Sequence, residues 1–217
     1  MRWSRPEPVY GPVRAAYRAG RQAFSRMRLD AELAEASPAR DSALTLGVFD
    51  GVHRGHQHVI RATVKEARKS GLLAVVATFK NHPGSVLRPD FSPRYITGLD
   101  ERLSLIGALG VDRVVPITFD LELSELRARD FVALLQRRLR MQALVVGPDF
   151  ALGRRREGDV ATLASLSSEM GFSLVVVDLL EDNVRPVRST VVRQALAEGD
   201  LSLVQTLLGR YFELEGA

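Results

Sequence analysis

Five short apolar runs, separated by amphipathic stretches, constrain the fold of this chain more than any other feature of its sequence. The runs are Ala43–Val48, Leu73–Thr78, Arg113–Ile117, Ala143–Val146 and Leu174–Asp178. Because they are apolar at successive positions rather than at alternate ones, they predict strands that are buried on both faces.

The stretches between these runs carry apolar residues at helical spacing. They are His56–Lys69, Glu101–Leu109, Ala128–Leu139 and Val160–Glu169. Strands that alternate with helices imply an α/β fold with a parallel sheet covered on both sides by right-handed crossovers. Ligands of such folds bind beyond the carboxyl ends of the strands, so the residues that follow each strand are the candidates for chemistry.

The composition allows one globular domain and excludes several chemistries. The chain has 217 residues, of which 46% are hydrophobic and 26% are charged, so it can bury a sizeable core. We expect residues 42–217 to form the domain and residues 1–41, with an Arg-rich helix at Ala15–Ala36, to form an extension. The absence of cysteine excludes disulfides, thiolate zinc sites and cysteine nucleophiles.

The charge and the lack of long apolar runs suggest the location and the partners. No run approaches the length of a membrane span and the amino terminus does not read as a signal peptide, so we expect a cytoplasmic protein without a membrane partner. The formal net charge of +4 is compatible with nucleic-acid binding. A protein that handles anionic nucleotides accounts for it equally well, and nucleic acid is not expected as a partner.

A glycine-rich turn with two histidines follows the first predicted strand. It reads Gly47-Val48-Phe49-Asp50-Gly51-Val52-His53-Arg54-Gly55-His56, and a helix begins directly afterwards. Glycines allow close backbone approach, and the amides at the start of a helix favour a phosphate. His53 and His56 could donate hydrogen bonds to oxygens that gain charge during phosphoryl transfer. Zinc is the rival ligand, but a helix would turn His58 about 200° away, and no metal site is predicted.

The pattern His-x-Gly-His, entered through Gly-x-Phe-Asp-Gly-Val-His, resembles the signature of the nucleotidyltransferase superfamily. The residues of this motif are similar to those of the FMN adenylyltransferase module of bacterial bifunctional riboflavin kinase/FAD synthetases. The resemblance implies a Rossmann-like three-layer fold with a central parallel sheet. It also implies a Mg²⁺-dependent transfer of AMP from ATP to FMN, which gives FAD and pyrophosphate. The residues implied to bind ATP in this turn are Gly47, Val48, Phe49, Asp50 and Gly55, with His53 and His56 as catalytic residues.

Three later segments extend the resemblance. Thr78-Phe79-Lys80-Asn81-His82-Pro83 is similar to Thr-Phe-x-Pro-His-Pro, with Asn81 in place of a proline. Gly147-Pro148-Asp149-Phe150-Ala151-Leu152-Gly153 is similar to Gly-x-Asp-Phe-x-Phe-Gly, with Leu152 in place of the second phenylalanine. Val187-Arg188-Ser189-Thr190-Val191-Val192-Arg193 is similar to Ile-Ser-Ser-Thr-x-x-Arg, with Arg188 in place of the first serine.

These segments complete the expected site. The resemblance implies that Ser189, Thr190 and Arg193 grip ATP phosphates as catalytic residues and that Asp149 contacts ATP. It implies that the flavin-binding residues are Phe79, Asn81, His82, Pro83, Phe150 and Leu152. Other readings stay open: Asp50 and Asp149 as turn residues, His82 as a loop former, and Ser189 as the cap of a helix that begins near Thr190.

The departures from the family pattern gather on the flavin side. Asn81, Leu87 and Leu152 stand where rings or proline are usual, so weak FMN binding is expected, whereas the ATP side is retained. The alternatives are a nucleotidyltransferase that acts on another phosphorylated acceptor, or a non-catalytic nucleotide- or nucleic-acid-binding protein. Riboflavin kinase activity is not expected, because no kinase module follows Tyr211.

Overall fold

The structure is a computed structural model that describes residues 28–88, 90–178, 180–182 and 185–213. Most of the predicted helix Ala15–Ala36, and most of the predicted extension, lie outside the described residues.

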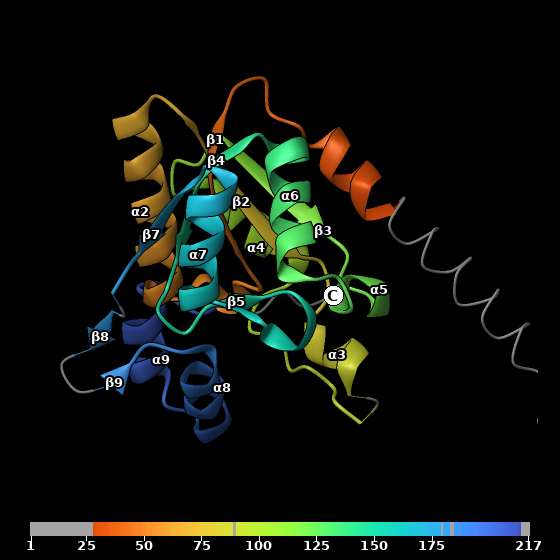
Figure 1. Ribbon diagram of the computed structural model, residues 1–217. Coiled ribbons are helices and arrows are strands. Elements are labelled where there is room, and N and C mark those ends of the chain that lie inside the picture. Colours follow the sequence, from red (N-terminus) through yellow and green to blue (C-terminus); the bar gives the residue numbers. More distant parts are fainter. Residues whose placement is uncertain (1–27, 89, 179, 183–184, 214–217) are drawn as a thin grey trace, which may run out of the picture.

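A parallel five-stranded sheet forms the centre of the molecule (Figure 1). Its strands are β1 (Ser42–Gly47), β2 (Leu73–Phe79), β3 (Arg113–Ile117), β4 (Met141–Val146) and β7 (Ser173–Val176). They are arranged in the order β3-β2-β1-β4-β7, and every neighbouring pair is parallel. The five predicted strands and the α/β class are therefore confirmed.

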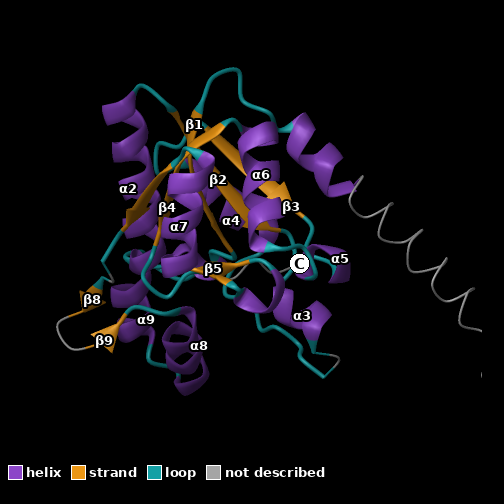
Figure 2. Ribbon diagram, in the orientation of Figure 1, coloured by secondary structure: helices purple, strands orange, loops and turns teal. Residues whose placement is uncertain are grey.

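Helices cover both faces of this sheet, as Figure 2 shows. They are α2 (Arg54–Ser70), α4 (Leu99–Gly107), α6 (Ala128–Leu139) and α7 (Val160–Met170). Successive side chains of a strand point to opposite faces. Ala43 of β1 therefore packs with Ala67 of α2, whereas Leu44 packs with residues of α6 and α7 in the main core. The small side chains on the first face allow α2 to lie close to the sheet.

The remaining short elements gather at the carboxyl ends of the strands (Figure 1). After β1 comes the 3₁₀ turn η1 (Asp50–Val52), and after β2 comes α3 (Pro83–Leu87). The elements that follow β3 and β4 are α5 (Leu121–Ser124), the hairpin of β5 (Ala151–Leu152) and β6 (Gly158–Asp159), and the 3₁₀ turn η2 (Arg154–Arg156) within it. The last elements are β8 (Glu181–Asp182), β9 (Arg185–Pro186), α8 (Ser189–Glu198) and α9 (Leu201–Leu208).

The helical residues 28–35 pack onto the domain. Leu29 and Leu33 are buried in the main core. Glu32 accepts hydrogen bonds from the backbone N–H of Thr118 at 2.8 Å and its hydroxyl at 2.7 Å, and it pairs with Lys80 at 2.9 Å. The described end of the predicted extension is thus part of the folded domain, and the boundary at residue 41 stays a prediction. Among the described residues, no helix combines the length and the apolar character that crossing a membrane requires.

Candidate active site

The turn after β1 has a left-handed backbone that other segments hold in place. Gly51 and Val52 have φ angles of 79° and 39°, and the second value is rare for a β-branched residue. The N–H of Gly51 donates to the hydroxyl of Thr97 at 3.0 Å, and Arg210 donates to the Gly51 carbonyl at 3.0 Å. Gln57 donates to the Val52 carbonyl at 3.0 Å. Such a conformation persists only where surrounding contacts fix it, which is common at functional sites.

His53 and His56 lie stacked at the start of α2. Their ring centroids are 3.6 Å apart with an interplanar angle of 18°, and the edge of Phe49 meets the ring of His56 at 5.2 Å. The Nδ1 of His53 accepts the backbone N–H of His56 at 3.2 Å and so caps the helix. In neutral His53 the proton must therefore reside on Nε2, which is free to donate.

Both imidazoles are neutral at physiological pH. Burial lowers the pKa of His53 to about 4. Burial also lowers the pKa of His56 well below its usual value, and the neighbouring His53, Arg102 and Arg193 lower it further. The Nδ1 of His56 is buried and finds no hydrogen-bond partner within the described part of the chain. Each ring thus offers one N–H, and the pair adds no positive charge of its own.

Asp50 is the buried carboxylate of this turn. Its Oδ1 accepts the backbone N–H groups of Ile96 at 2.9 Å and Thr97 at 3.2 Å. These amides lie 46 and 47 positions further along the chain, whereas the turn-residue reading expected bonds to local amides. Its Oδ2 also pairs with Nη2 of Arg193 at 2.6 Å, a contact that the sequence pattern did not indicate. Asp50 therefore connects three segments of the chain.

The amino terminus of α8 lies against the turn after β1. The helix begins at Ser189, one residue earlier than expected, with Arg188 at the N-cap position and no side-chain cap. The prediction that Ser189 caps the helix is therefore wrong, because its hydroxyl donates to the backbone carbonyl of Asp50 at 3.0 Å instead. Arg193 lies one turn further on, and its Nε donates to the carbonyl of Arg94 at 2.8 Å.

Arg102 is a site-forming residue that the sequence analysis missed. Its side chain is 1% exposed, and it donates to the carbonyls of Val48 at 3.0 Å and Phe79 at 2.9 Å. Val48 directly follows β1 and Phe79 is the last residue of β2, so the guanidinium connects the ends of these two strands. Burial lowers the pKa of Arg102. The available signal was its spacing of four residues from buried Ile106, which places a charge on the apolar face of α4.

A pocket of about 940 Å³ opens at the carboxyl ends of the strands. The predicted site residues that line it are Gly47, Val48, Phe49, Asp50, His53, Gly55, His56, Phe79, His82, Pro83, Asp149, Phe150, Leu152, Ser189, Thr190 and Arg193. Its lining includes the histidine turn and the start of α8. It also includes rings that pack against the main core, among them Phe79 and Phe119, which meet edge to face at 5.3 Å.

Asn81 is the one predicted site residue that the lining of this pocket does not include. Its side-chain amide donates to the carbonyl of Phe119 at 2.9 Å and its oxygen accepts the N–H of Phe119 at 2.9 Å. Both hydrogen-bonding groups are thus occupied in holding the loop after β3. His82 lines the pocket and also shapes a loop, because its Nδ1 accepts the N–H of Gly84 at 2.9 Å and caps α3.

Leu152 and Leu87, two departures on the flavin side, differ in their surroundings. Leu152 belongs to the main core, and its side chain is 5% exposed although it reaches the pocket wall. Leu87 lines the same pocket but is 53% exposed. Asp149, at the pocket mouth, is ion-paired with Arg188 at 2.5 Å.

The described residues do not bring together three or more His, Cys, Asp and Glu side chains in a group that could hold a metal ion. The two carboxylates named above are occupied by arginines, Asp50 by Arg193 and Asp149 by Arg188.

Comparisons with known proteins identify relatives of this chain. A family model described as FAD synthetase matches residues 35–191. The bifunctional riboflavin kinase/FMN adenylyltransferase of Escherichia coli strain K12 is 37% identical over 181 residues, which are 83% of this chain and 58% of that protein. The protein of the same name from Pseudomonas fluorescens is 36% identical over 178 residues, which are 82% and 57% of the two chains.

A solved structure has the same fold. It is described as a macrolide-efflux protein from Streptococcus pneumoniae, and it aligns with a TM-score of 0.76 and 28% identity over 83% of this chain and 59% of that one. The chain thus spans somewhat less than three fifths of the length of these relatives.

Proposed function

Since this chain belongs to the FAD synthetase family, we propose that it transfers AMP from ATP to FMN and releases FAD and pyrophosphate. The observation that carries this proposal is a single pocket lined by two unlike sets of groups. One set is the neutral imidazoles, helix amides and an arginine, which suit phosphates, and the other is the aromatic rings, which suit a flavin.

The proposed reaction needs no covalent help from the protein. A phosphate oxygen of FMN attacks the α-phosphorus of ATP, and the bond from that phosphorus to the oxygen bridging to the β-phosphate breaks. Pyrophosphate leaves with the electron pair of the broken bond. The attacking oxygen is already anionic, so positioning and charge stabilisation account for the acceleration.

His53 and His56 are proposed to stabilise the charge that develops on the phosphate oxygens. As neutral rings they donate one N–H each, and the hydrogen bond from the His56 amide leaves Nε2 of His53 as the donor. Donors that are already aligned before the reaction lower the barrier because they need no reorganisation. The amides at the start of α8, at Ser189 and Thr190, add further donors.

Arg193 is proposed to bind phosphate oxygens from a position that Asp50 fixes. The hydrogen bonds to Asp50 and to the Arg94 carbonyl occupy two of the five N–H groups of a guanidinium. The other N–H groups remain for the ligand, and the buried carboxylate prevents the side chain from changing rotamer. Asp50 is thus a positioning residue in this proposal, rather than an ATP ligand.

Magnesium is proposed to enter as the complex with ATP. Asp50 and Asp149 are engaged by arginines, and Mg²⁺ is commonly held through substrate phosphates and water with few protein ligands. Bound in this way, the ion would neutralise charge on the pyrophosphate that leaves. A cytoplasmic location and the absence of nucleic-acid partners stay predictions of the sequence.

The test is an incubation of the purified protein with Mg²⁺, ATP and FMN, followed by chromatography of the products. We expect FAD and pyrophosphate in equal amounts. A parallel incubation replaces FMN with other phosphorylated acceptors, such as a nicotinamide mononucleotide or a sugar phosphate. Adenylylation of one of these without FAD formation would contradict the proposal and favour another acceptor.

A further inference from the structure

Arg155 lines the pocket from a hairpin that packs on the face of the sheet opposite to α2 and its histidine turn. The histidines begin α2, which packs on one face of the sheet, whereas α5, α6 and the β5–β6 hairpin belong to the opposite side. Arg155 lies in η2 within that hairpin, and η2 packs against α5. Arg155 lines the same pocket as the rings of Phe79, Phe119 and Phe150.

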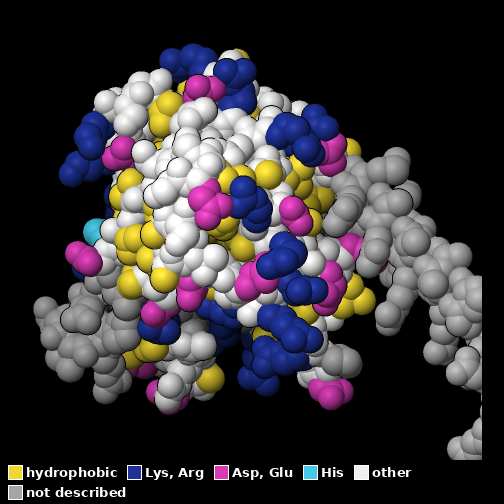
Figure 3. Space-filling model, in the orientation of Figure 1, with side chains coloured by type: hydrophobic (Ala, Val, Ile, Leu, Met, Phe, Trp, Pro, Cys, Tyr) yellow, Lys and Arg dark blue, Asp and Glu magenta, His cyan; other side chains and the backbone are white. Residues whose placement is uncertain are grey.

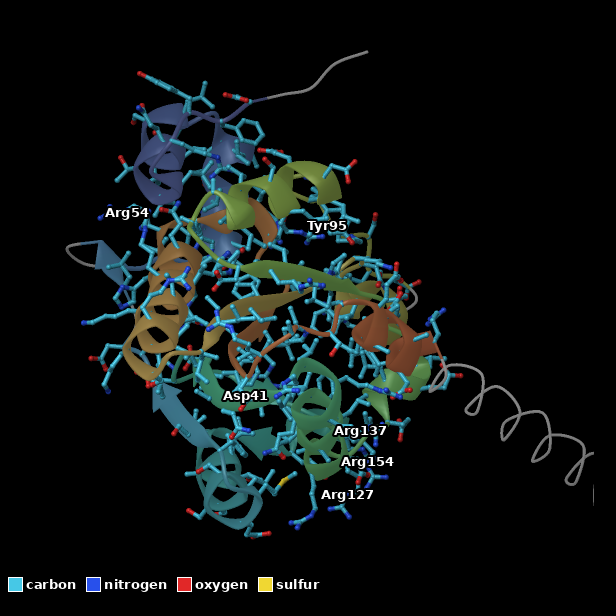
Figure 4. The ribbon with its side chains drawn as sticks, turned by 90° about the horizontal axis from the view of Figure 1, so that it is seen from above. Asp41, Arg54, Tyr95, Arg127, Arg137 and Arg154 are labelled. Carbon is cyan, nitrogen blue, oxygen red and sulfur yellow. The ribbon has the colours of Figure 1, made fainter. Side chains whose placement is uncertain are left out.

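The guanidinium of Arg155 has no hydrogen bond or ion pair to any residue that the structure describes. Its neighbours are occupied differently. Arg156 donates to the carbonyl of Asp149 at 3.0 Å. Arg154 lies outside the pocket near Glu157, whose pKa is lowered first by the hydrogen bond from the Ala128 backbone and further by Arg127 and Arg154. Figure 4 shows Arg127 and Arg154 near each other at the rim of the molecule, and Figure 3 shows dark blue side chains spread over the face that Figure 1 presents. Arg155 is therefore a cation that faces the pocket with its donors unused.

The backbone fixes where this side chain starts. Arg155 has φ 52° and ψ 25°, a left-handed conformation that glycine adopts far more easily than arginine. The N–H of Arg154 donates to the Leu126 carbonyl at 2.8 Å, and Gly153 approaches Ala128 so closely that a Cβ would lie 2.6 Å from its nitrogen. The hairpin is thus anchored at the start of η2, and an arginine stands where glycine would be unstrained.

Aromatic rings and the guanidinium of Arg155 in one pocket suit a ligand that has both a flat apolar ring and hydrogen-bond acceptors. The rings of Phe79, Phe119 and Phe150 suit a planar apolar surface, but a flavin ring also has a pyrimidine edge with two carbonyl oxygens and an acceptor nitrogen. A planar guanidinium can donate to two such acceptors at once. We propose that Arg155 binds the carbonyl-bearing edge of the isoalloxazine ring, an inference that rests on the proposed function.

The experiment compares Arg155→Ala with Arg154→Ala, a matched control that removes the neighbouring arginine outside the pocket. The dissociation constants of FMN, riboflavin and ATP are measured by flavin fluorescence and calorimetry. Riboflavin shares the ring but lacks the phosphate. We expect Arg155→Ala to weaken FMN and riboflavin equally, by about five- to tenfold, and to leave ATP unchanged. Arg154→Ala should leave all three constants unchanged.

Arg155→Gly is a second variant that separates a loss of flavin affinity from a loss of folding. Glycine suits the left-handed backbone, so this variant should melt at or above the wild-type temperature and still lose flavin affinity. Equal flavin affinities in the Arg155 and Arg154 variants would overturn the inference, as would a loss for FMN without one for riboflavin, which would indicate a phosphate contact. A wild-type protein that forms FAD while the Arg155 variants bind flavin normally would sink this inference alone. A wild type that makes no FAD would instead refute the proposed function.

Discussion

His53 has two tasks at the scale of single residues. Its Nδ1 caps α2 through the His56 amide, and its Nε2 is the proposed phosphate donor. A change to alanine removes both the helix cap and the proposed phosphate donor. A loss of activity in that variant would therefore not show which of the two roles was responsible. Asparagine is a better replacement because it is among the preferred N-cap residues and its short side chain does not reproduce the imidazole donor.

We predict that His53→Asn lowers kcat by about a hundredfold, the usual effect of removing one transition-state donor, with little change in melting temperature. His53→Ala should show the same loss of turnover together with a further loss of about 1 kcal/mol in the free energy of unfolding. Steady-state assays and thermal melts of both variants check this. Wild-type turnover in His53→Asn would refute the catalytic assignment.

The same variant should alter the pH dependence of stability. The pKa of His53 is about 4 in the folded protein and 6.5 in the unfolded chain, so between these values only the unfolded chain binds the proton. This histidine alone therefore lowers the free energy of unfolding by about 2 kcal/mol between pH 7 and pH 5, and His56, whose pKa burial also lowers, adds to the fall. Urea unfolding at both pH values should show a smaller fall in His53→Asn, and an equal fall would mean that His53 is protonated in the folded state.

At the scale of elements, side chains that bond to backbone groups set the walls of the pocket. Asn81 fixes the loop after β3 through Phe119, and Arg102 joins the ends of β1 and β2. On the flavin side, α3 presents exposed Leu87 to the pocket, while β5 presents Leu152 from within the core. The sequence pattern treated these two leucines alike, but only Leu87 has room for a larger side chain.

We predict that Leu87→Phe tightens FMN by up to about tenfold, because an aromatic pair contributes roughly 0.5–1.5 kcal/mol beyond area burial. Leu152→Phe should instead lower the free energy of unfolding by about 1–3 kcal/mol through overpacking, without tighter FMN binding. Calorimetry with FMN and ATP, and urea unfolding of both variants, test this. ATP affinity is the internal control, and tighter FMN binding in Leu152→Phe alone would reverse the assignment.

At the scale of the whole molecule, helical residues 28–35 complete the main core. Leu33 is fully buried there, and Glu32 of the same segment bonds to the loop after β3. The amino-terminal segment thus supports the sheet from a distance in sequence. These residues belong to the predicted helix Ala15–Ala36, whose polar, Arg-rich composition did not indicate this role.

We predict that Leu33→Ala lowers the free energy of unfolding by about 2–5 kcal/mol, the usual cost of truncating a buried leucine. Glu35→Ala, an exposed change on the same helix, should stay within about 0.5 kcal/mol of wild type. Urea unfolding monitored by circular dichroism decides between them. Similar stabilities of the two variants would mean that the segment is an appendage, as its composition suggests.

The sequence by itself determined the sheet and the position of the site. Strands such as Ala43–Val48, buried on both faces, and the turn from Gly47 to His56 are patterns written in neighbouring residues, so they can be read without the fold. Parallel strands bring their carboxyl ends to one edge, and that rule already gathered most of the candidate residues there.

Only the tertiary structure decided which groups of the chain those residues contact. Asp50 and Arg193 are 143 positions apart, and Asn81 and Phe119 are 38 apart, so no local pattern marks either pair. No local pattern marks the burial of Arg102 or Leu33 either. Arg102 is buried because carbonyls at the strand ends accept its hydrogen bonds, and Leu33 is buried because it packs in the main core against the sheet. Hydrogen bonding and burial depend on which distant segments meet, and that meeting is a property of the folded chain alone.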